Sequence, residues 1–180
     1  IDRYGAGCNA VGTGIVSAIL AWVFAPFAPG LHVWSDLLGA ARSLCQHAEG
    51  IACILGTGSN SCFYNGKIIV KNVRPGGYIL GDEGSGAVIG KKFWSDVLKG
   101  LSPAGVTSDF LDKFRTTPND IMESVYNRPF PNRYLASVAY FLADYMGVDY
   151  VAHLVTSSFF DFFHRNIRQY DYQNYPTRFV

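Results

Sequence analysis

Hydrophobic positions in the first half of the chain have strand-like spacing in three stretches. Residues 50–56 form a continuous apolar run of strand length. Residues 59–72 predict two strands that turn at Asn65-Gly66, because an Asn-Gly pair favours the tight turn of a hairpin. Residues 76–80 predict a further short extended piece. These stretches indicate the strands of one buried sheet.

Helix-like spacing separates the strand-like stretches. Ser35 or Asp36 is expected to cap a helix over residues 37–48. The elements expected before it are a short strand at 1–7, a helix at 9–24 and a buried strand at 31–34. Strand, helix, strand and hairpin in this order predict an α/β fold around a central sheet.

Residues 14–31 are apolar for most of their length and raise the question of a membrane span. The interruptions are Gly14, Ser17, Pro26 and Pro29. A spanning helix needs roughly 20 consecutive apolar residues, and the stretch also lacks the basic flank and the small-residue cleavage site of a signal peptide. We therefore expect a buried helix at a subunit or domain contact, and no membrane association.

From residue 82 onward the pattern becomes helical. The expected helices cover 82–100 with Gly100 as C-cap, 107–114, 118–127, 131–147 and 149–173. One stripe of the last helix is expected to be core and consists of Val151, Leu154, Val155, Phe159, Phe162 and Phe163. Residues 175–180 resemble a strand, and the chain, which begins with Ile1, is expected to be cut from a longer protein.

Composition and charge exclude several classes of function. The 180 residues include 15 basic and 14 acidic side chains, so there is no electrostatic footprint for nucleic acid. The four cysteines, Cys8, Cys45, Cys53 and Cys62, lack CxxC spacing, which indicates neither a zinc site nor a redox pair. Buried reduced thiols in a cytosolic protein are expected instead.

A first glycine cluster, LGTGSNS at residues 55–61, follows the apolar strand. Glycines let main-chain N–H groups converge on an anion, and Thr57, Ser59, Asn60 and Ser61 add neutral donors, which suits a phosphate or a polyol. The cluster matches neither the P-loop nor the dinucleotide-binding pattern. Ordinary turn chemistry is the alternative interpretation.

Two acidic positions lie at other expected strand ends. In LGDEGSG, residues 80–86, Asp82 is expected either to cap the following helix together with Ser85, or to accept hydrogen bonds from sugar hydroxyls. Asp36 can be a simple cap as well. Ligands of open α/β sheets, however, bind beyond the carboxyl ends of strands. A carboxylate near a glycine-rich cradle is what phosphoryl transfer from ATP to an alcohol requires.

Three ordered motifs carry a resemblance to a known family: SDLLGAAR at 35–42, GIACILGTGSNS at 50–61 and GGYILGDEGSGAVIGKKF at 76–93. They resemble the N-acetylglucosamine kinase and BadF/BadG/BcrA/BcrD ATPase family. The resemblance implies the ribonuclease-H-like fold of actin-like sugar kinases and Hsp70 ATPases, here with a helical C-terminal part. It also implies a cytoplasmic enzyme that uses ATP and Mg²⁺ to phosphorylate an amino sugar, at the C6 hydroxyl if the resemblance extends to the substrate.

The resemblance assigns roles to individual residues. It implies that Asp36 is the general base and that Thr57 contacts the nucleotide phosphates in a loop shaped by Gly56 and Gly58, with Ser59 beside it. The residues that it implies for sugar binding are Asn60, Gly76, Gly77 and Asp82. No residue of this chain is assigned to a metal.

Two features of the family pattern are missing from the sequence. The first phosphate loop, whose aspartate organises Mg²⁺, and the adenosine motif do not occur. We therefore interpret residues 1–30 as the end of a first lobe with a connecting helix, and residues 31–180 as a second lobe of a two-lobed kinase. The chain alone is expected to be inactive, and the apolar segment either covers a homodimer contact or is exposed by the missing domain.

Two other functions stay open. The first is an ATPase that activates a 2-hydroxyacyl-CoA dehydratase, although the four cysteines offer no obvious ligand set for its iron–sulfur cluster. The second is a sugar sensor that binds without turnover.

Overall fold

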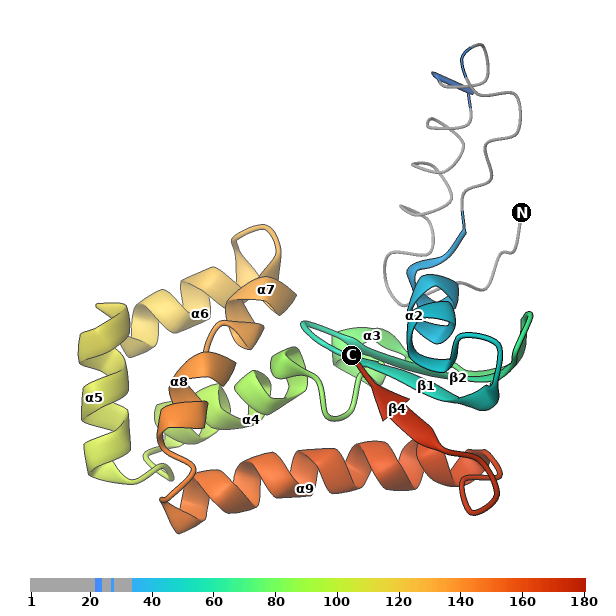
Figure 1. Ribbon diagram of the computed structural model, residues 1–180. Helices are drawn as coiled ribbons and strands as arrows, with labels where there is room; N and C mark the ends of the chain where they lie inside the picture. The colour runs from blue at the N-terminus through green and yellow to red at the C-terminus, as the bar shows by residue number, and fades with distance from the viewer. Residues whose placement is uncertain (1–21, 24–26, 28–33) are drawn as a thin grey trace. The chain divides into compact units, whose positions relative to one another are not determined.

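The computed structural model describes residues 22–23, 27 and 34–180 (Figure 1). The elements expected at 1–7, 9–24 and 31–34 fall almost wholly outside these residues. The chain divides into two compact units. The sheet unit contains the described part of Ile1–Ile54, with Ser59–Gly77 and Asn166–Val180, and the helical unit contains Leu55–Gly58 and Tyr78–Arg165.

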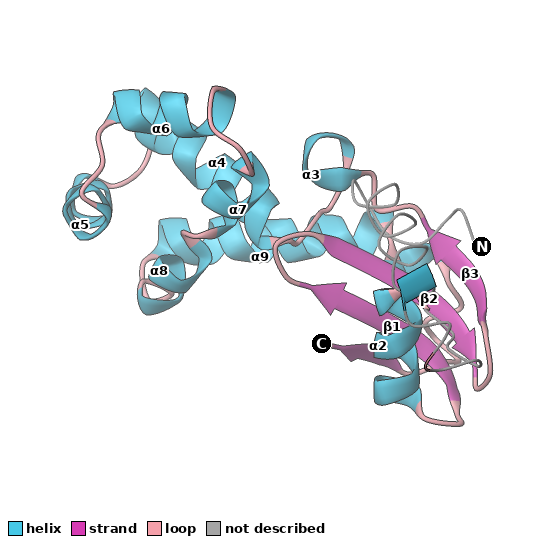
Figure 2. Ribbon diagram, turned by 90° about the horizontal axis from the view of Figure 1, so that it is seen from above, coloured by secondary structure: helices cyan, strands magenta, loops and turns pink. Residues whose placement is uncertain are grey.

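The sheet unit is built on four strands in the order β3-β2-β1-β4 (Figure 2). The strands are β1 (Glu49–Leu55), β2 (Ser59–Asn65), β3 (Ile69–Val73) and β4 (Thr177–Phe179). β2 and β3 are antiparallel, whereas β4 runs parallel to β1 with Ile51 opposite Thr177. The strand expected at residues 175–180 is thus confirmed, and it pairs with the strand predicted from the apolar run at residues 50–56.

The predicted hairpin between β2 and β3 is confirmed. Gly66 has φ of +86°, which glycine adopts without strain. Asn65 closes the turn, because its Oδ1 accepts hydrogen bonds from the N–H groups of Lys67 and Ile68 at 3.1 and 2.9 Å.

Helix α2 (Asp36–Cys45) packs on one face of the sheet. The buried residues of this contact are Leu37, Leu38, Ala41, Cys45, Ala52, Cys62 and Tyr64. Burial raises the pKa of the Cys53 and Cys62 thiols to about 12, so both stay protonated at neutral pH. Cys45, Cys53 and Cys62 are all buried and free, as the sequence predicted.

The segment from Asn166 to Tyr175 covers other parts of β2 and β3. It begins with a short 3₁₀ helix, η1 (Ile167–Gln169). The Tyr170 hydroxyl lies 2.9 Å from Ser61 Oγ and accepts a hydrogen bond from the Val73 N–H at 2.9 Å. Burial raises the pKa of Tyr170 to about 12, which keeps this hydroxyl neutral.

The helical unit is packed around α4 (Gly86–Lys99), which ends at Gly100 as expected. The other helices are α3 (Gly77–Leu80, of which Gly77 is assigned to the sheet unit), α5 (Ala104–Phe114), α6 (Pro118–Tyr126), α7 (Pro131–Ala136), α8 (Ala139–Asp144) and α9 (Asp149–Arg165). Its core combines aliphatic side chains with the buried rings of Phe93, Trp94, Phe110 and Phe141. α4 and α7 approach so closely that a Cβ on Gly90 would lie 1.8 Å from the Leu135 carbonyl oxygen.

One strand prediction and several helix predictions need correction, including the last helix, which ends at Arg165 and not at residue 173. Residues 77–80 form α3 and no extended piece, since Gly76 and Gly77 both have positive φ, 79° and 74°, and turn the chain before it. α5 begins at Ala104 and not at residue 107, because Pro103 occupies the N-cap and supplies a suitable φ of −56°. The helix predicted at 131–147 is two helices, and the Ser137 hydroxyl bonds the Tyr134 carbonyl at the break.

In the part of the chain that the structure describes, no helix is long and apolar enough to cross a membrane.

Candidate functional site

The glycine-rich loop between β1 and β2 is held to the start of α4 by backbone hydrogen bonds. The Gly86 N–H donates to the Gly56 carbonyl at 2.8 Å, and the Ala87 N–H donates to the Thr57 carbonyl at 3.1 Å. The Gly56 N–H donates to the Gly58 carbonyl at 2.9 Å and closes the turn. The carbonyl oxygens of Gly56 and Thr57 therefore face the helix, and Thr57 is exposed.

Two N–H groups of this loop are left to bind a ligand. Among the described residues, none accepts a hydrogen bond from the N–H of Thr57 or of Gly58. At the helix, by contrast, Gly86, Ala87 and Val88 all donate to protein acceptors, Val88 to the hydroxyl of Ser85. The loop, and not the helix end, thus offers donors to an anion.

Of the two alternatives for Asp82, capping of α4 is not realised, because Ser85 alone is the N-cap. Asp82 is instead buried, with 8 % of its surface exposed, and has φ of +54°. A non-glycine residue in this region is strained, and such strain gathers at functional sites. The carboxylate of Asp82 lies against the loop, where a Cβ built on Gly58 would be 2.8 Å from its Oδ2.

Gly58→Ala is expected to displace the Asp82 carboxylate and to weaken ligand binding at the loop by about tenfold, which is the effect of about 1.4 kcal/mol. The reason is the 2.8 Å approach of the new methyl group to Asp82 Oδ2. Calorimetric titration with a nucleotide measures the change. Gly105→Ala is the matched control, because nothing lies within 4 Å of a Cβ there. Equal affinities in the two variants would contradict the expected displacement.

A pocket of about 340 Å³ opens beside the loop, wholly within the helical unit. One wall is polar backbone from Gly56, Thr57, Gly84 and Gly86. The other wall is apolar and aromatic and consists of Ile89, Ala136, Ala139, Tyr140 and Phe159. Its volume and mixed lining are typical of sites for small organic ligands. Because Phe159 is 45 % exposed and lines this pocket, its assignment to the core needs correction, whereas Val151, Leu154 and Phe162 are buried as predicted.

Asp36 belongs to the sheet unit and begins α2. Ser35 is the N-cap, its hydroxyl accepting from the Leu38 N–H at 3.2 Å, so the cap alternative for Asp36 is not realised. Asp36 is exposed, and its Oδ1 accepts a hydrogen bond from the Leu37 N–H at 2.8 Å. The structure does not bring Asp36 and Asn60 into hydrogen-bond contact with each other.

Asn60, in contrast, is almost fully buried in β2, with 6 % of its surface exposed. Its Oδ1 accepts from the Ser61 N–H and from Asn72 Nδ2, both at 2.9 Å. Its own Nδ2 is covered and has no partner among the described residues, a situation that costs about 1–3 kcal/mol unless a ligand or water satisfies it. Ser59, next to it, is also buried.

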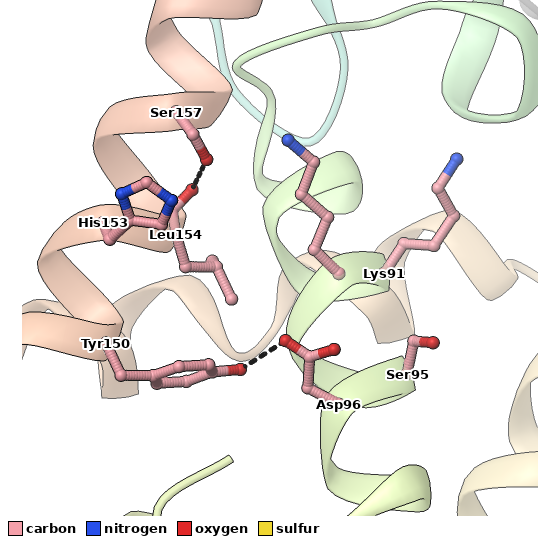
Figure 3. Close-up of a pocket in the computed structure, with 8 residues that line it drawn as sticks. Lys91, Ser95, Asp96, Tyr150, His153, Leu154 and Ser157 are labelled. Carbon is pink, nitrogen blue, oxygen red and sulfur yellow. Dashed lines mark hydrogen bonds between the residues drawn. The ribbon is translucent and has the colours of Figure 1, made fainter. Parts of the chain in front are cut away.

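A second pocket, of about 420 Å³, lies between α4 and α9 (Figure 3). Several of its polar groups already have protein partners: Tyr150 donates to Asp96 Oδ2 at 2.7 Å, and Lys92 pairs with Asp161 at 2.9 Å. Burial, followed by this hydrogen bond, raises the pKa of Tyr150. None of the residues predicted for the site lines this pocket, and we interpret it as a structural groove.

The described residues include no cluster of three or more His, Cys, Asp or Glu side chains that could hold a metal ion. Glu83, the acidic neighbour of Asp82, forms an ion pair with Arg165 at 3.4 Å.

Sequence reasoning missed the apolar wall of the 340 Å³ pocket and the partner of Asn60. The wall residues Ala136, Ala139 and Tyr140 come from two helices that were expected to be one. The sequence does single out Asn72, because it is a polar residue within a predicted strand. In the structure it lies directly opposite Cys62 in the register of β2 and β3.

Comparison with solved structures supports the resemblance carried by the three motifs. Over 98 % of its length the chain is similar to the crystal structure of the Putative N-acetylglucosamine Kinase from Porphyromonas gingivalis, at 48 % identity and a TM-score of 0.88. The corresponding protein from Chromobacterium violaceum matches 89 % of the chain at 24 % identity and a TM-score of 0.71, which indicates a shared fold. No family model and no curated protein matches the chain.

The resemblance is therefore confirmed to this extent: the chain is similar to a protein named Putative N-acetylglucosamine Kinase, and its mixed α/β fold matches the folds of both structures. The chain spans 62 % of the length of the first relative and 58 % of the second.

Proposed function

We propose that this protein takes part in the ATP-dependent phosphorylation of an amino sugar of the N-acetylglucosamine type. The observation that carries the proposal is the loop at Gly56–Gly58, with two N–H groups available to an anion beside a pocket of about 340 Å³. The 48 % identity to the Porphyromonas gingivalis protein adds independent support. A ribonuclease-H-like, two-lobed architecture is part of the same proposal, whereas a homodimer and a cytoplasmic location stay predictions.

The nucleotide would bind in the helical unit. Its phosphates would accept hydrogen bonds from the N–H groups of Thr57 and Gly58, with the Thr57 hydroxyl as a further donor and Gly56 shaping the loop. The role that the resemblance implies for Ser59, which is buried in the sheet unit, stays a prediction. The base of the nucleotide would lie against the apolar and aromatic residues of the pocket, which include Tyr140 and Phe159. The mixture of polar backbone and apolar side chains around the pocket fits this ligand.

The sugar would be held by Asn60, Gly76, Gly77 and Asp82, and Asp36 would act as general base. In the transfer step, the sugar oxygen forms a bond to the γ-phosphorus while the bond from that phosphorus to the bridging oxygen of ADP breaks. The hydroxyl proton goes to the carboxylate of Asp36, whose exposure leaves its second oxygen accessible. Mg²⁺ usually neutralises the phosphates in such reactions, but the described residues do not form a site for it, and no step is derived through it.

The function is tested by ADP release from ATP with the full-length protein and a panel of acceptors: N-acetylglucosamine, N-acetylmuramic acid, glucosamine and glucose. Turnover with an amino sugar supports the proposal. Sugar binding without ADP release would favour a sensor. A cluster absorbance near 400 nm in anaerobically purified protein, as iron–sulfur proteins show, would favour the dehydratase activator and overturn the kinase assignment.

Thr57→Val is expected to raise the KM for ATP by about tenfold, because a hydrogen bond to a charged group contributes about 1.5–3 kcal/mol. Valine has nearly the same shape, and position 57 is exposed, so the fold should be unaffected. Initial rates at varied ATP and saturating sugar measure the effect. Thr116→Val, at a threonine outside the proposed site, is the control, and an unchanged KM for ATP in Thr57→Val would remove this residue from the nucleotide site.

A further inference from the structure

The side-chain amide of Asn60 has one group without a hydrogen-bond partner in the described part of the chain, its NH₂. Oδ1 has two donors, whereas Nδ2 is covered and has no acceptor among the described residues. Buried polar groups are nearly always hydrogen-bonded, so an amide NH₂ left in this state indicates that something absent from the protein chain accepts from it.

Backbone groups determine which end of each amide points where. Asn72 Nδ2 lies 2.6 Å from the Ser61 carbonyl oxygen and 3.2 Å from the Val73 carbonyl oxygen, and carbonyl oxygens only accept. The atom at this position must therefore be the NH₂ end of Asn72. Its third neighbour, the Asn60 atom at 2.9 Å, must then be an acceptor.

The Ser61 N–H leads independently to the same orientation. A backbone N–H only donates, and it lies 2.9 Å from the same Asn60 atom, which must therefore be Oδ1. Reversing the Asn60 amide would bring its NH₂ group against two donors at once. The direction of Asn60 Nδ2 is thus imposed by its neighbours and not chosen freely.

We propose that Asn72 is a positioning residue for sugar binding. It holds the amide of Asn60 so that Nδ2 donates a hydrogen bond to an oxygen acceptor of the sugar. This inference rests on the proposed function, because it takes the sugar as the ligand of Asn60. It adds the direction of the hydrogen bond. Asn60 donates it, so the sugar atom that Asn60 recognises is an acceptor oxygen, either of a hydroxyl or of an acetyl carbonyl.

Asn72 is itself fixed by the segment that covers the hairpin. The Tyr170 hydroxyl donates to the Ser61 carbonyl oxygen at 2.9 Å and accepts from the Val73 N–H at 2.9 Å. These are the two residues whose carbonyl groups hold Asn72. The buried phenol thus fixes the backbone that orients Asn72, which in turn orients Asn60.

The test titrates the full chain with N-acetylglucosamine and follows ¹⁵N–¹H spectra, with backbone amide signals reporting affinity in every variant and side-chain amide signals reporting the state of Asn60 where it is present. The variants are Asn72→Ala, Asn60→Asp and the double variant. Asn60→Asp keeps Oδ1 as the acceptor of both hydrogen bonds and replaces the donor Nδ2 with an oxygen, which also places a carboxylate at this buried position. Asn127→Ala is the matched control, because that exposed asparagine also bonds another side chain, Glu123 at 2.6 Å. Asn72→Ser replaces Asn72→Ala if the alanine variant does not fold.

We expect the sugar to shift the Asn60 amide signals of the wild type. Asn72→Ala should raise the half-saturating sugar concentration at least tenfold, and Asn127→Ala less than twofold. The double variant should bind no more weakly than Asn60→Asp alone, because both changes remove one contact. Wild-type affinity in Asn72→Ala, or losses that simply add in the double variant, would overturn the positioning role, since a structural effect alone produces those results.

Failure of the proposed function gives a different result. If the wild type shows no saturable shift with the sugar, the sugar is not the ligand. The positioning role is then decided without ligand: Asn72→Ala should merge or move the two Nδ2 proton signals of Asn60, and unchanged signals would overturn the role.

Discussion

Asp36→Asn is expected to lower the kcat of sugar phosphorylation by about 10²–10⁴-fold, the usual contribution of a positioned general base. Asparagine has the shape of aspartate, and its Oδ1 can still accept the Leu37 N–H that Asp36 accepts at 2.8 Å. The start of α2 is independently secured by Ser35. The variant therefore removes the ability to take a proton and little else. ADP-release rates at saturating ATP and sugar measure the loss, and a binding titration with the sugar should show affinity within about threefold of the wild type.

Two controls make this result interpretable. Ser35→Ala removes the helix cap and should lower stability by about 0.5–2 kcal/mol while leaving most of kcat. Asp112→Asn changes an exposed aspartate in α5, outside the proposed site, and should alter neither. A kcat for Asp36→Asn within about threefold of the wild type would assign the base to another residue.

Phe110→Ala is expected to lower the free energy of unfolding of the helical unit by about 3–5 kcal/mol. Phe110 has no exposed surface, and its ring centroid lies 4.6 Å from that of Trp94 and 5.1 Å from that of Phe93. Truncation leaves a cavity among large rings on several helices, which cannot collapse to fill it. Urea unfolding followed by near-ultraviolet circular dichroism measures the change, because the packing of Trp94 contributes to that signal.

The matched control is Phe160→Ala, at a phenylalanine that is 60 % exposed on α9. It should change stability by less than about 0.5 kcal/mol. Similar unfolding midpoints for the two variants would mean that Phe110 is not central to this core.

Local chemistry allowed the strand β1, the hairpin and the end of α4 to be predicted. An Asn-Gly pair can satisfy its turn with its own atoms, and Gly100 adopts the left-handed conformation that ends a helix, with φ of 67°. Neither feature needs a partner from elsewhere in the chain. These elements could therefore be predicted from short stretches of the sequence alone.

The features that sequence reasoning missed depend on distant partners. Asp82 does not cap α4, because its carboxylate is buried against Gly58, a residue that precedes it by 24 positions in the sequence. Ser85 is the cap instead. The Tyr170 hydroxyl meets Ser61 across a separation of 109 residues. No local pattern contains such a contact.

The candidate site was predictable in the same uneven way. The glycine motifs located the loop, because glycine-rich turns at strand ends are visible in any sequence. The wall formed by Ala136, Tyr140 and Phe159 was not visible, since these residues look like ordinary members of amphipathic helices until α7, α8 and α9 are packed.

The backbone hydrogen bonds between the loop and α4 have a consequence for mutational tolerance. Because the Ala87 N–H holds the carbonyl of residue 57, and not its side chain, any residue at position 57 can keep the loop in register. Saturation mutagenesis at this position should therefore yield folded proteins almost throughout, and the spread in their activity would measure ligand recognition separately from stability. Position 90, closed by the Leu135 carbonyl, should give the opposite profile, with glycine alone tolerated.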